Sequence, residues 1–400
     1  MTVPASDIRF IFYLPNLHSY LDRVELISHI AEKVGRGVLV TSRNDTSLDG
    51  LNVKDLEIIE VPRGRRYPGR SAVAASRLVG NLLDTDDFNV VHDTFAHLGP
   101  LFWRRRRHRG VVFLTSFYSL AEWDFREWIR PNYGMRTLTD RNLRQWIPRA
   151  ITQRFITSAA DCVVVQAPGL IDRVGQHQRR ARSKLAWIPN NVVTPSDAGI
   201  SQSEGTEIEL LWVGGFALGK GGGELLTLLR RAAERSIPVH ATVVGSSSPL
   251  DRTIRPHVDH LHLRQRIENE ELADNIEFIS RVAPEEMDRY YRGSDWLFHA
   301  TYIDGSPRVV IEALVRGLPV IGSKHPGVVV LDPEGRYIHL ADPFDADSVL
   351  DQLVSEKNDA ESHVSRSEAG RDFVREHFSS DAVSDKYVQL YSRLLSERVD

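Results

Sequence analysis

Two acidic residues, Asp304 and Glu312, stand eight positions apart in the stretch YIDGSPRVVIEALVRGLPVIGS, residues 302–323. Asp304 falls in an Asp-Gly turn, and Glu312 falls about one turn into the helix-like segment that follows. A turn residue and a solvated helix residue would be the simplest interpretation. The apolar neighbours Ile311 and Ala313 argue against free solvation of Glu312, however, and a carboxylate is a good acceptor for ribose hydroxyls. We therefore predict that the two acids hold the two ends of one ligand.

A glycine-rich segment, GGFALGKGGGELL, follows the apolar run IELLWV and leads into another helix-like segment. Its glycines would let the backbone approach a bulky anion, and the helix N-terminus would offer N–H groups and the positive end of its dipole. Lys220 would add a cation, whose charge-assisted bond to a phosphate contributes about 1.5–3 kcal/mol. The spacings match neither the P-loop nor the dinucleotide fingerprint, so a flexible loop is the alternative to a phosphate site. The glycines are Gly214, Gly215, Gly219, Gly221, Gly222 and Gly223.

Short β-rich runs alternate with helix-like segments along the whole chain, which predicts α/β domains with parallel sheets and helices on both faces. The runs are DIRFIFY, GVLVT, DLEIIEV, NVVH, GVVFLT, ADCVVVQ, IELLWV, VHATVV, NIEFI, DWLFHA and LPVIGS. The Ser-, Gly- and acid-rich stretch 194–207 has no periodicity and is the best linker. We predict doubly wound domains at 1–193 and 206–375, and an amphipathic C-terminal helix within 376–400. In two such domains facing each other, ligands gather at the carboxyl ends of strands, in the cleft between them.

The composition fits a soluble globular protein with two domains. Its 400 residues are 42% hydrophobic and 26% charged, and no apolar run is long enough to span a bilayer. The N-terminus lacks the basic start and apolar stretch of a signal peptide. The single cysteine, Cys162, cannot form an internal disulfide. These features predict the reducing cytoplasm.

Three stretches together resemble the signature blocks of family-4 glycosyltransferases, which have the GT-B fold. They are WIPNNVV, VGGFALGKGG and NIEFISRVAPEEMDRYYRGSDWLFHATYIDGSPRVVIEALVRGLPVIGS, and they run in order from about residue 186 to 325. Several linked motifs are more specific than any single one. The N-terminal half matches this family only in outline. The resemblance implies two Rossmann-like domains, the first binding an acceptor and the second a nucleotide sugar, with the C-terminal helix returning to the N-terminal domain.

The resemblance also implies roles for particular residues. The family's pair of acids falls on Asp304 and Glu312, with Asp in place of the commoner Glu, so that Asp304 would contact the donor sugar and Glu312 the ribose. Lys220 falls on the lysine that holds the pyrophosphate. Other donor-binding positions are Gly214 and Gly215 in the glycine-rich loop, Arg281 and Val282 near the base, and Gly305, Ser306, Pro307 and Arg308 at the phosphates. No cofactor and no metal are implied.

The chain departs from the family pattern in both halves. The family usually carries an arginine five residues before Lys220, where this chain has Gly215. Either Arg308 or Arg281 substitutes for it, or the enzyme is slower, or the chain binds without turnover. The first loop, YLPNLHSYLDR, lacks the family's glycines. In NVVHDTFAHLGP the place of a frequent histidine is Thr94, which leaves His92 and His97 as candidates, although a histidine at a strand end is often a structural hydrogen-bonder.

The middle of the chain is basic and aromatic. Residues 61–190 hold 22 Lys and Arg against 10 Asp and Glu, a net charge of +12, and they include RRRRHRG at 104–110. A solvated face and a buried aromatic core would explain these features. They would also suit the rim of an acceptor site, with an anionic or lipid-linked acceptor, or weak peripheral contact with an anionic inner-membrane surface. No nucleic-acid motif accompanies the charge, so nucleic acid is not an expected partner.

The expected activity is transfer of a sugar, of hexosyl type, from a UDP-sugar or GDP-sugar to a hydroxyl acceptor, in glycan or glycoconjugate biosynthesis. The resemblance implies retention of the anomeric configuration. Two other functions remain open at this stage. A sugar-nucleotide epimerase of similar build would convert the donor without a second substrate, and a non-catalytic relative would bind nucleotide sugar without turnover.

Overall fold

A computed structural model of the protein describes most of the chain, and two compact units contain the described residues. These residues are 8–15, 17, 20–41, 53, 55–61, 68–83, 88–94, 98, 111–117, 121–134, 146–195, 205–252, 258–280, 282–283, 286–302, 306–341 and 344–399. Unit 1 consists of residues 1–193 and 378–400, and unit 2 consists of residues 194–377. Unit 1 is therefore built from both ends of the chain.

Unit 1 has a parallel sheet of seven strands in the order β3-β2-β1-β4-β5-β6-β7. Branched and aromatic residues dominate the central strands and are buried on both faces, as expected for a parallel sheet covered by helices. The strands are β1 (Ile8–Leu14), β2 (Gly37–Thr41), β3 (Leu56–Glu60), β4 (Phe88–Asp93), β5 (Val111–Phe117), β6 (Cys162–Val165) and β7 (Leu185–Trp187).

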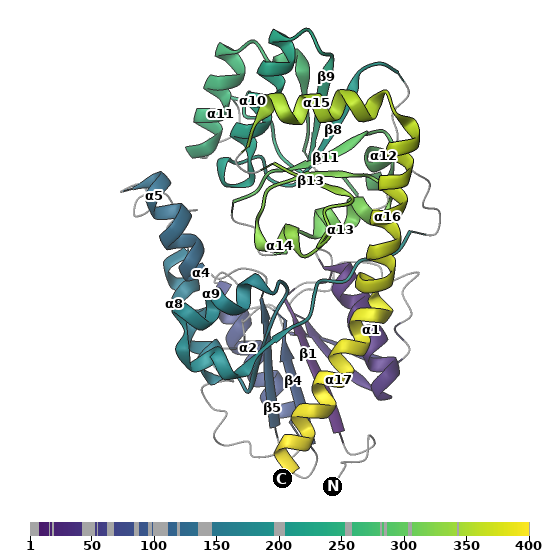
Figure 1. The fold of residues 1–400 in the computed structure, drawn as a ribbon. Coiled ribbons are helices and arrows are strands. Elements are labelled where there is room, and N and C mark those ends of the chain that lie inside the picture. The colour runs from purple at the N-terminus through teal and green to yellow at the C-terminus, as the bar shows by residue number, and fades with distance from the viewer. Residues whose placement is uncertain are drawn as a thin grey trace. The chain divides into compact units, whose positions relative to one another are not determined.

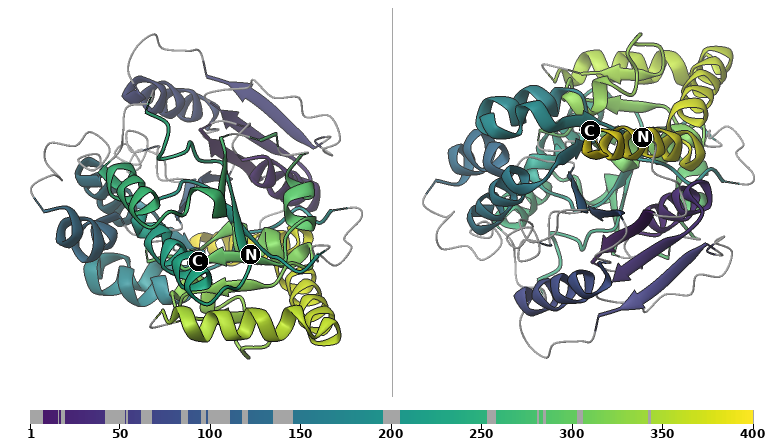
Figure 2. Two further views of the ribbon diagram at one scale, coloured as in Figure 1. Left: turned by 90° about the horizontal axis from the view of Figure 1, so that it is seen from above. Right: turned by 90° about the horizontal axis from the view of Figure 1, so that it is seen from below.

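The C-terminal helix α17 (Ser380–Val399), yellow in Figures 1 and 2, packs against α1 (Leu21–Val34) in unit 1. Its Tyr387 and Tyr391 are buried in one core cluster with Phe10 and Phe12 of β1. The other helices described in this unit are α2 (Pro68–Leu82), α4 (Ala121–Trp123), the π-helix η3 (Asp124–Ile129), α5 (Arg130–Tyr133), α8 (Trp146–Ala159), α9 (Gly169–His177) and the 3₁₀-helix η4 (Arg179–Lys184).

Unit 2 has a parallel sheet of six strands in the order β10-β9-β8-β11-β12-β13. The strands are β8 (Ile208–Val213), β9 (Val239–Val244), β10 (Ile276–Ile279), β11 (Trp296–His299), β12 (Val320–Gly322) and β13 (Ile338–Leu340). The helices are η5 (Leu218–Lys220), α10 (Gly222–Glu234), α11 (Val258–Asn269), η6 (Ala273–Asn275), α12 (Met287–Arg292), α13 (Arg308–Val315), α14 (Pro326–Val329), α15 (Ala346–Lys357) and α16 (Ala360–Phe378).

Both sheets have the doubly wound order, in which the chain starts at a central strand and reverses direction once. In unit 2 the reversal lies between β8 and β11, which are hydrogen-bonded neighbours. Ligands of such sheets bind at the carboxyl ends of the strands on either side of this point. The predicted α/β class, and the predicted return of the C-terminal helix to the N-terminal domain, are confirmed.

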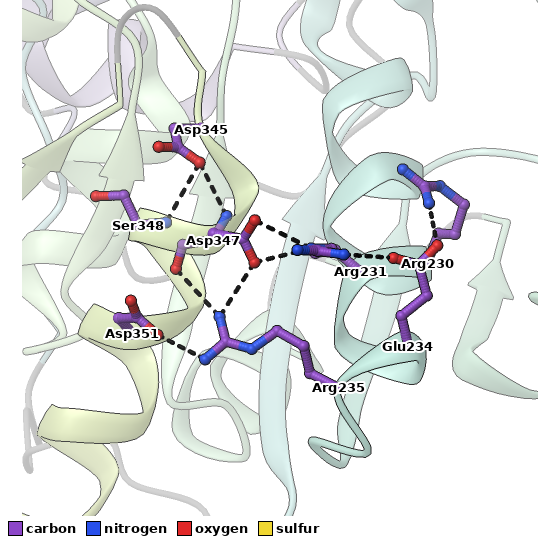
Figure 3. A network of polar contacts seen from close by, with 8 residues as sticks. All are labelled: Arg230, Arg231, Glu234, Arg235, Asp345, Asp347, Ser348 and Asp351. Carbon is purple, nitrogen blue, oxygen red and sulfur yellow. Dashed lines mark hydrogen bonds and ion pairs between the residues drawn. The ribbon is translucent and has the colours of Figure 1, made fainter.

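An ion-pair network holds α10 against α15 in unit 2 (Figure 3). Asp347 accepts hydrogen bonds from Arg231 at 2.8 Å and from Arg235 at 3.3 Å, and Arg235 also contacts Asp351 at 2.6 Å. The bonds from Arg231 lower the pKa of Asp347 below its ordinary value. Each exposed pair is individually weak, but the network fixes the C-terminal half of the helix whose N-terminus carries the glycine-rich loop.

Candidate active site

Three loops leave the carboxyl ends of neighbouring strands in unit 2 and are connected by hydrogen bonds. The Tyr302 backbone N–H, after β11, donates to the carbonyl of Gly219 in the glycine-rich loop after β8, at 3.0 Å. The Thr301 hydroxyl also lies 3.5 Å from this carbonyl. The hydroxyl of Ser323, after β12, donates to the carbonyl of Thr301. The loops after β8 and β11, which the sequence singled out, therefore meet the loop after β12 at the carboxyl edge of the sheet, at its reversal point.

The glycine-rich loop turns sharply so that α10 begins beside the end of β11. Gly214 has a φ of 111° and donates its N–H to the Val244 carbonyl at 2.7 Å. No side chain caps the N-terminus of α10 among the described residues, where Gly221 occupies the cap position. Lys220 is the last residue of η5, directly before this cap, and is partly exposed. A cation and a helix N-terminus thus lie at the same rim, as the sequence predicted.

Gly221 is required by geometry, because its φ is 92° and an added Cβ would lie 2.3 Å from the Ala300 carbonyl oxygen. We expect Gly221→Ala to destabilise unit 2 by about 3 kcal/mol, from left-handed strain and overpacking together. Gly223→Ala is the matched control, since its Cβ would meet only ordinary contacts at 3.6 Å or more. Urea denaturation of the two variants measures the difference, and equal midpoints would contradict this explanation.

Glu312 lies on α13, where a buried tyrosine holds its carboxylate. The Tyr291 hydroxyl donates to Glu312 Oε2 at 3.0 Å. Burial, and then the Glu312 charge, raise the pKa of Tyr291 well above its ordinary value, so the hydroxyl remains a donor. The Arg316 guanidinium lies 4.8 Å from the centre of the Tyr291 ring. Within the described part of the chain no hydrogen bond reaches Oε1 of Glu312, so a positioned carboxylate retains an oxygen for a ligand hydroxyl.

The remaining donor-side candidates divide into those that the structure describes and those outside the described residues. Ser306 and Pro307 are buried directly before α13, and Arg308 is the first residue of that helix. Val282 is partly buried after β10, and Gly215 is exposed in the glycine-rich loop. Asp304, Gly305 and Arg281 lie outside the described residues, and so does the histidine candidate His97.

His92 occupies the structural role that the sequence allowed for it. It lies in β4, only 3% exposed, with Nδ1 2.8 Å from the Tyr391 hydroxyl and Nε2 2.5 Å from the Ser116 hydroxyl. Burial, and then the charge of Arg23, lower its pKa to about 3, so the ring is neutral near pH 7. Both ring nitrogens are engaged inside unit 1, and we therefore leave His92 out of the reaction proposed below.

Sequence reasoning missed Tyr291 and the three-loop hydrogen bonding. Tyr291 stands in DRYYRG, where two adjacent tyrosines give no indication of which one faces Glu312. Only the three-dimensional packing of α12 beside α13 distinguishes them. The connecting bonds use backbone groups of Gly219 and Thr301, whose partners depend on which strands are neighbours.

No group of three or more His, Cys, Asp or Glu suited to a metal occurs among the described residues. The described helices include none that is both long enough and apolar enough to cross a membrane.

Comparison with known proteins gives one family for each part of the chain. The family described as "Glycosyl transferases group 1" matches residues 194–373, and the "Glycosyl transferase 4-like domain" matches residues 24–191. The chain is 26% identical over 274 residues to mannosylfructose-phosphate synthase of Agrobacterium fabrum, covering 66% of this chain and 59% of that protein. It is 28% identical over 182 residues to spore coat protein SA of Bacillus subtilis, covering 44% of this chain and 47% of that protein. The chain thus spans about half the length of the curated relatives it matches.

Solved structures of glycosyltransferases share the fold. Sucrose-phosphate synthase from Thermosynechococcus elongatus superposes with a TM-score of 0.73 at 17% identity, covering 97% of this chain and 99% of that one. A structure of Anabaena HepE in complex with UDP and glucose gives a TM-score of 0.65 at 15% identity, covering 96% and 99%. WaaG, a glycosyltransferase involved in lipopolysaccharide biosynthesis, gives 0.65 at 15% identity over the same shares. The two doubly wound units therefore have the arrangement of secondary structure that these structures have.

Proposed function

The chain belongs to the family-4 glycosyltransferases of GT-B fold, and we propose that it transfers a sugar from a nucleoside-diphosphate donor to a hydroxyl acceptor with retention of configuration. The observation that supports this proposal best is the meeting of the loops after β8, β11 and β12 at the reversal point of the unit 2 sheet. Lys220, the uncapped N-terminus of α10 and the positioned carboxylate of Glu312 all belong to this region.

In the proposed reaction the donor diphosphate lies against the glycine-rich loop. Lys220 and the N-terminal dipole of α10 stabilise the negative charge that develops as the bond between the sugar C1 and the phosphate oxygen breaks. The acceptor oxygen bonds to C1 on the same face, and its proton passes to the departing phosphate oxygen. No protein base is required for this transfer, which is consistent with His92 being neutral and buried.

Glu312 and Asp304 would hold the two ends of the donor. In this proposal Glu312 accepts hydrogen bonds from the ribose hydroxyls through Oε1, while Tyr291 keeps Oε2 in place. Asp304 contacts the transferred hexose. A uridine or guanosine donor is proposed, and the UDP in the HepE structure favours uridine. No metal or cofactor takes part in the proposed chemistry.

We propose an anionic or lipid-linked acceptor, a cytoplasmic location and weak contact with anionic membrane. The net charge of +12 of residues 61–190 supports the anionic acceptor and the contact with anionic membrane. In addition, Ile147 and Ile151 on α8 are 36% and 66% exposed, and Arg149 lies on the same helix. Exposed apolar and basic side chains in the first half of this helix suit a surface that rests against lipid headgroups.

A thermal-shift panel of uridine, guanosine, adenosine and thymidine diphosphates tests the proposed donor. A nucleotide supplied at about 100 times its dissociation constant should stabilise the fold by about 2.7 kcal/mol. We expect one nucleotide to do so in the wild-type protein and to lose this effect in Glu312→Ala. Failure of all four nucleotides at millimolar concentration would remove the proposed function, and conversion of the sugar nucleotide without acceptor would favour an epimerase.

A non-catalytic nucleotide-sugar binder is a second candidate, because Gly215 replaces the cation usual in the family. An added Cβ at Gly215 would meet nothing within 4 Å, and Gly215 does not have the positive φ of Gly214. If the chain is an enzyme, Gly215→Arg should be well folded and should raise the rate of donor turnover about tenfold, through one more charge-assisted bond to the diphosphate, whereas nucleotide binding without turnover would support the binder. Gly214→Arg is the control, since its φ of 111° makes that substitution strained. An unchanged rate in Gly215→Arg would mean that another cation already fills this role.

A further inference from the structure

A depression with basic side chains lies on the surface of unit 1, whereas the loops described above belong to unit 2. It has a volume of about 690 Å³, within the range of small-molecule sites. Its described lining residues come from α9, labelled in Figure 1, and from η4. The lining residues are Ile171, Asp172, Gly175, Gln176, Arg179 and Arg182.

Its two arginines have no ion pair with any described residue. Arg126 and Arg154, also in unit 1, both contact Glu122 at 2.9 and 3.8 Å, whereas Arg179 and Arg182 are exposed and make no such contact within the described chain. Arg182 nevertheless has a defined position. An added Cβ at Gly175 would lie 3.4 Å from Arg182 Cγ, so the glycine leaves room for the stem of this arginine along α9.

The backbone under these arginines is firmly held. Gln178 donates its N–H to the Val174 carbonyl at 2.7 Å, and Ala181, only 1% exposed, donates to the Gln178 carbonyl at 2.8 Å. Lys184 closes the segment by donating to the Ala160 carbonyl at 2.8 Å. Ala181 lies between Arg179 and Arg182 and packs into the core, so the backbone that carries both arginines is held in place. This lowers the conformational entropy that is lost when the two guanidinium groups bind one anion.

The lining favours an anion attached to a hydroxyl-bearing carrier over a bare anion. Two guanidinium groups are well suited to a phosphate, which they bind through parallel N–H donors. The exposed Asp172 carboxylate would repel a bare phosphate but would accept hydrogen bonds from hydroxyl groups, and Gln176 can both donate and accept. Ile171 adds an apolar surface for the C–H face of a sugar ring.

The η4 part of the depression, which carries both arginines, lies near the amino ends of strands in the unit 1 sheet. η4 ends directly before β7 begins, and Lys184 of η4 bonds to the residue preceding β6 by two positions. Both contacts belong to the amino ends of strands, whereas substrates bind at the carboxyl ends. We propose that this depression is a second, non-catalytic site that binds a small phosphorylated sugar, with Arg179 and Arg182 on the phosphate and Asp172 and Gln176 on the hydroxyls.

Titration calorimetry on the 400-residue chain with glucose 6-phosphate, glucose and inorganic phosphate tests this proposal. We expect glucose 6-phosphate to bind more tightly than either of the other two ligands. The double variant Arg179→Ala/Arg182→Ala should lose at least about tenfold in affinity for it. Arg180→Ala is the matched control, since Arg180 is exposed between the two but does not line the depression, and its affinity should stay within about twofold of wild type.

The Asp172→Asn variant should change the affinity for phosphate in the opposite direction to the double arginine variant. Removal of the carboxylate should strengthen the binding of inorganic phosphate and reduce the preference for the sugar phosphate. The melting temperature and the response to nucleoside diphosphates should be unchanged in all these variants, which separates this proposal from the function of unit 2. Equal losses in Arg180→Ala and the double variant, or no binding of glucose 6-phosphate by the wild-type protein at millimolar concentration, would overturn it.

Discussion

Lys220→Ala should lower kcat/KM for donor turnover about 100- to 1,000-fold. Lys220 is the cation of the glycine-rich loop and stands directly before the N-terminus of α10. In the proposed reaction it opposes the charge that develops on the leaving diphosphate, and loss of one such stabilising group costs about two to three orders of magnitude in rate. The fold should be unaffected, because the backbone N–H of Lys220, which donates to the Ala217 carbonyl at 3.1 Å, is kept in the variant.

Two further variants serve as controls for this prediction. Lys220→Arg keeps the charge and should retain more activity than Lys220→Ala. Arg230→Ala removes a cation further along α10, where Arg230 pairs with Glu234, and should leave kcat/KM within about twofold of wild type. Release of nucleoside diphosphate from the donor measures all three without knowledge of the acceptor. A Lys220→Ala enzyme as fast as wild type would remove Lys220 from the mechanism.

Unit 1 should lose up to about 5 kcal/mol of its free energy of unfolding as the pH falls from 6.5 to about 3. His92 titrates near 6.5 when unfolded, but burial lowers its pKa to about 3 in the fold. Between these two values the unfolded chain binds a proton that the folded one does not, so acid favours unfolding. At about 1.4 kcal/mol for each pH unit, the contribution is complete above pH 6.5 and is lost progressively below it.

His92→Gln provides the control, because glutamine does not titrate and can still bond to Tyr391 and Ser116. Hydrogen exchange of the β4 and α17 amides at several pH values would give the local free energy of opening in both proteins. The readout must come from unit 1, since burial also lowers the pKa of His339 in unit 2. If the pH dependence of these amides were the same in the wild-type protein and in the His92→Gln variant, the assignment to this ring would be wrong.

The order of strands and helices could be predicted from the sequence because apolar runs bounded by turn residues are strong local signals. GVLVT, IELLWV and VHATVV coincide with β2, β8 and β9. Two strands were not predicted, β7 (Leu185–Trp187) and β13 (Ile338–Leu340), which are short and lie at the edges of their sheets. Three residues are too few to show a period, so only pairing with a neighbouring strand defines them.

The candidate site could be proposed from the sequence where it rests on residue type and spacing, and not where it rests on packing. The glycine-rich loop with Lys220 and the position of Glu312 follow from the chain itself. The partner of Glu312 does not, because Tyr291 comes from a helix whose approach to α13 is a tertiary property. His92 shows the same limit, since its burial depends on Tyr391, almost 300 residues later in the sequence.

That long separation also orders events during synthesis on the ribosome. The core cluster that α1 forms on one face of the unit 1 sheet also includes Val383, Tyr387, Leu390 and Tyr391, so this face emerges first but stays only partly covered until the final helix is translated. Residues 194–377 are complete before that point and can collapse on their own. Domains usually fold in the order in which they are made. Here the unit that begins the chain is the last to mature, and its exposed apolar strands are the surface that a nascent-chain chaperone would meet.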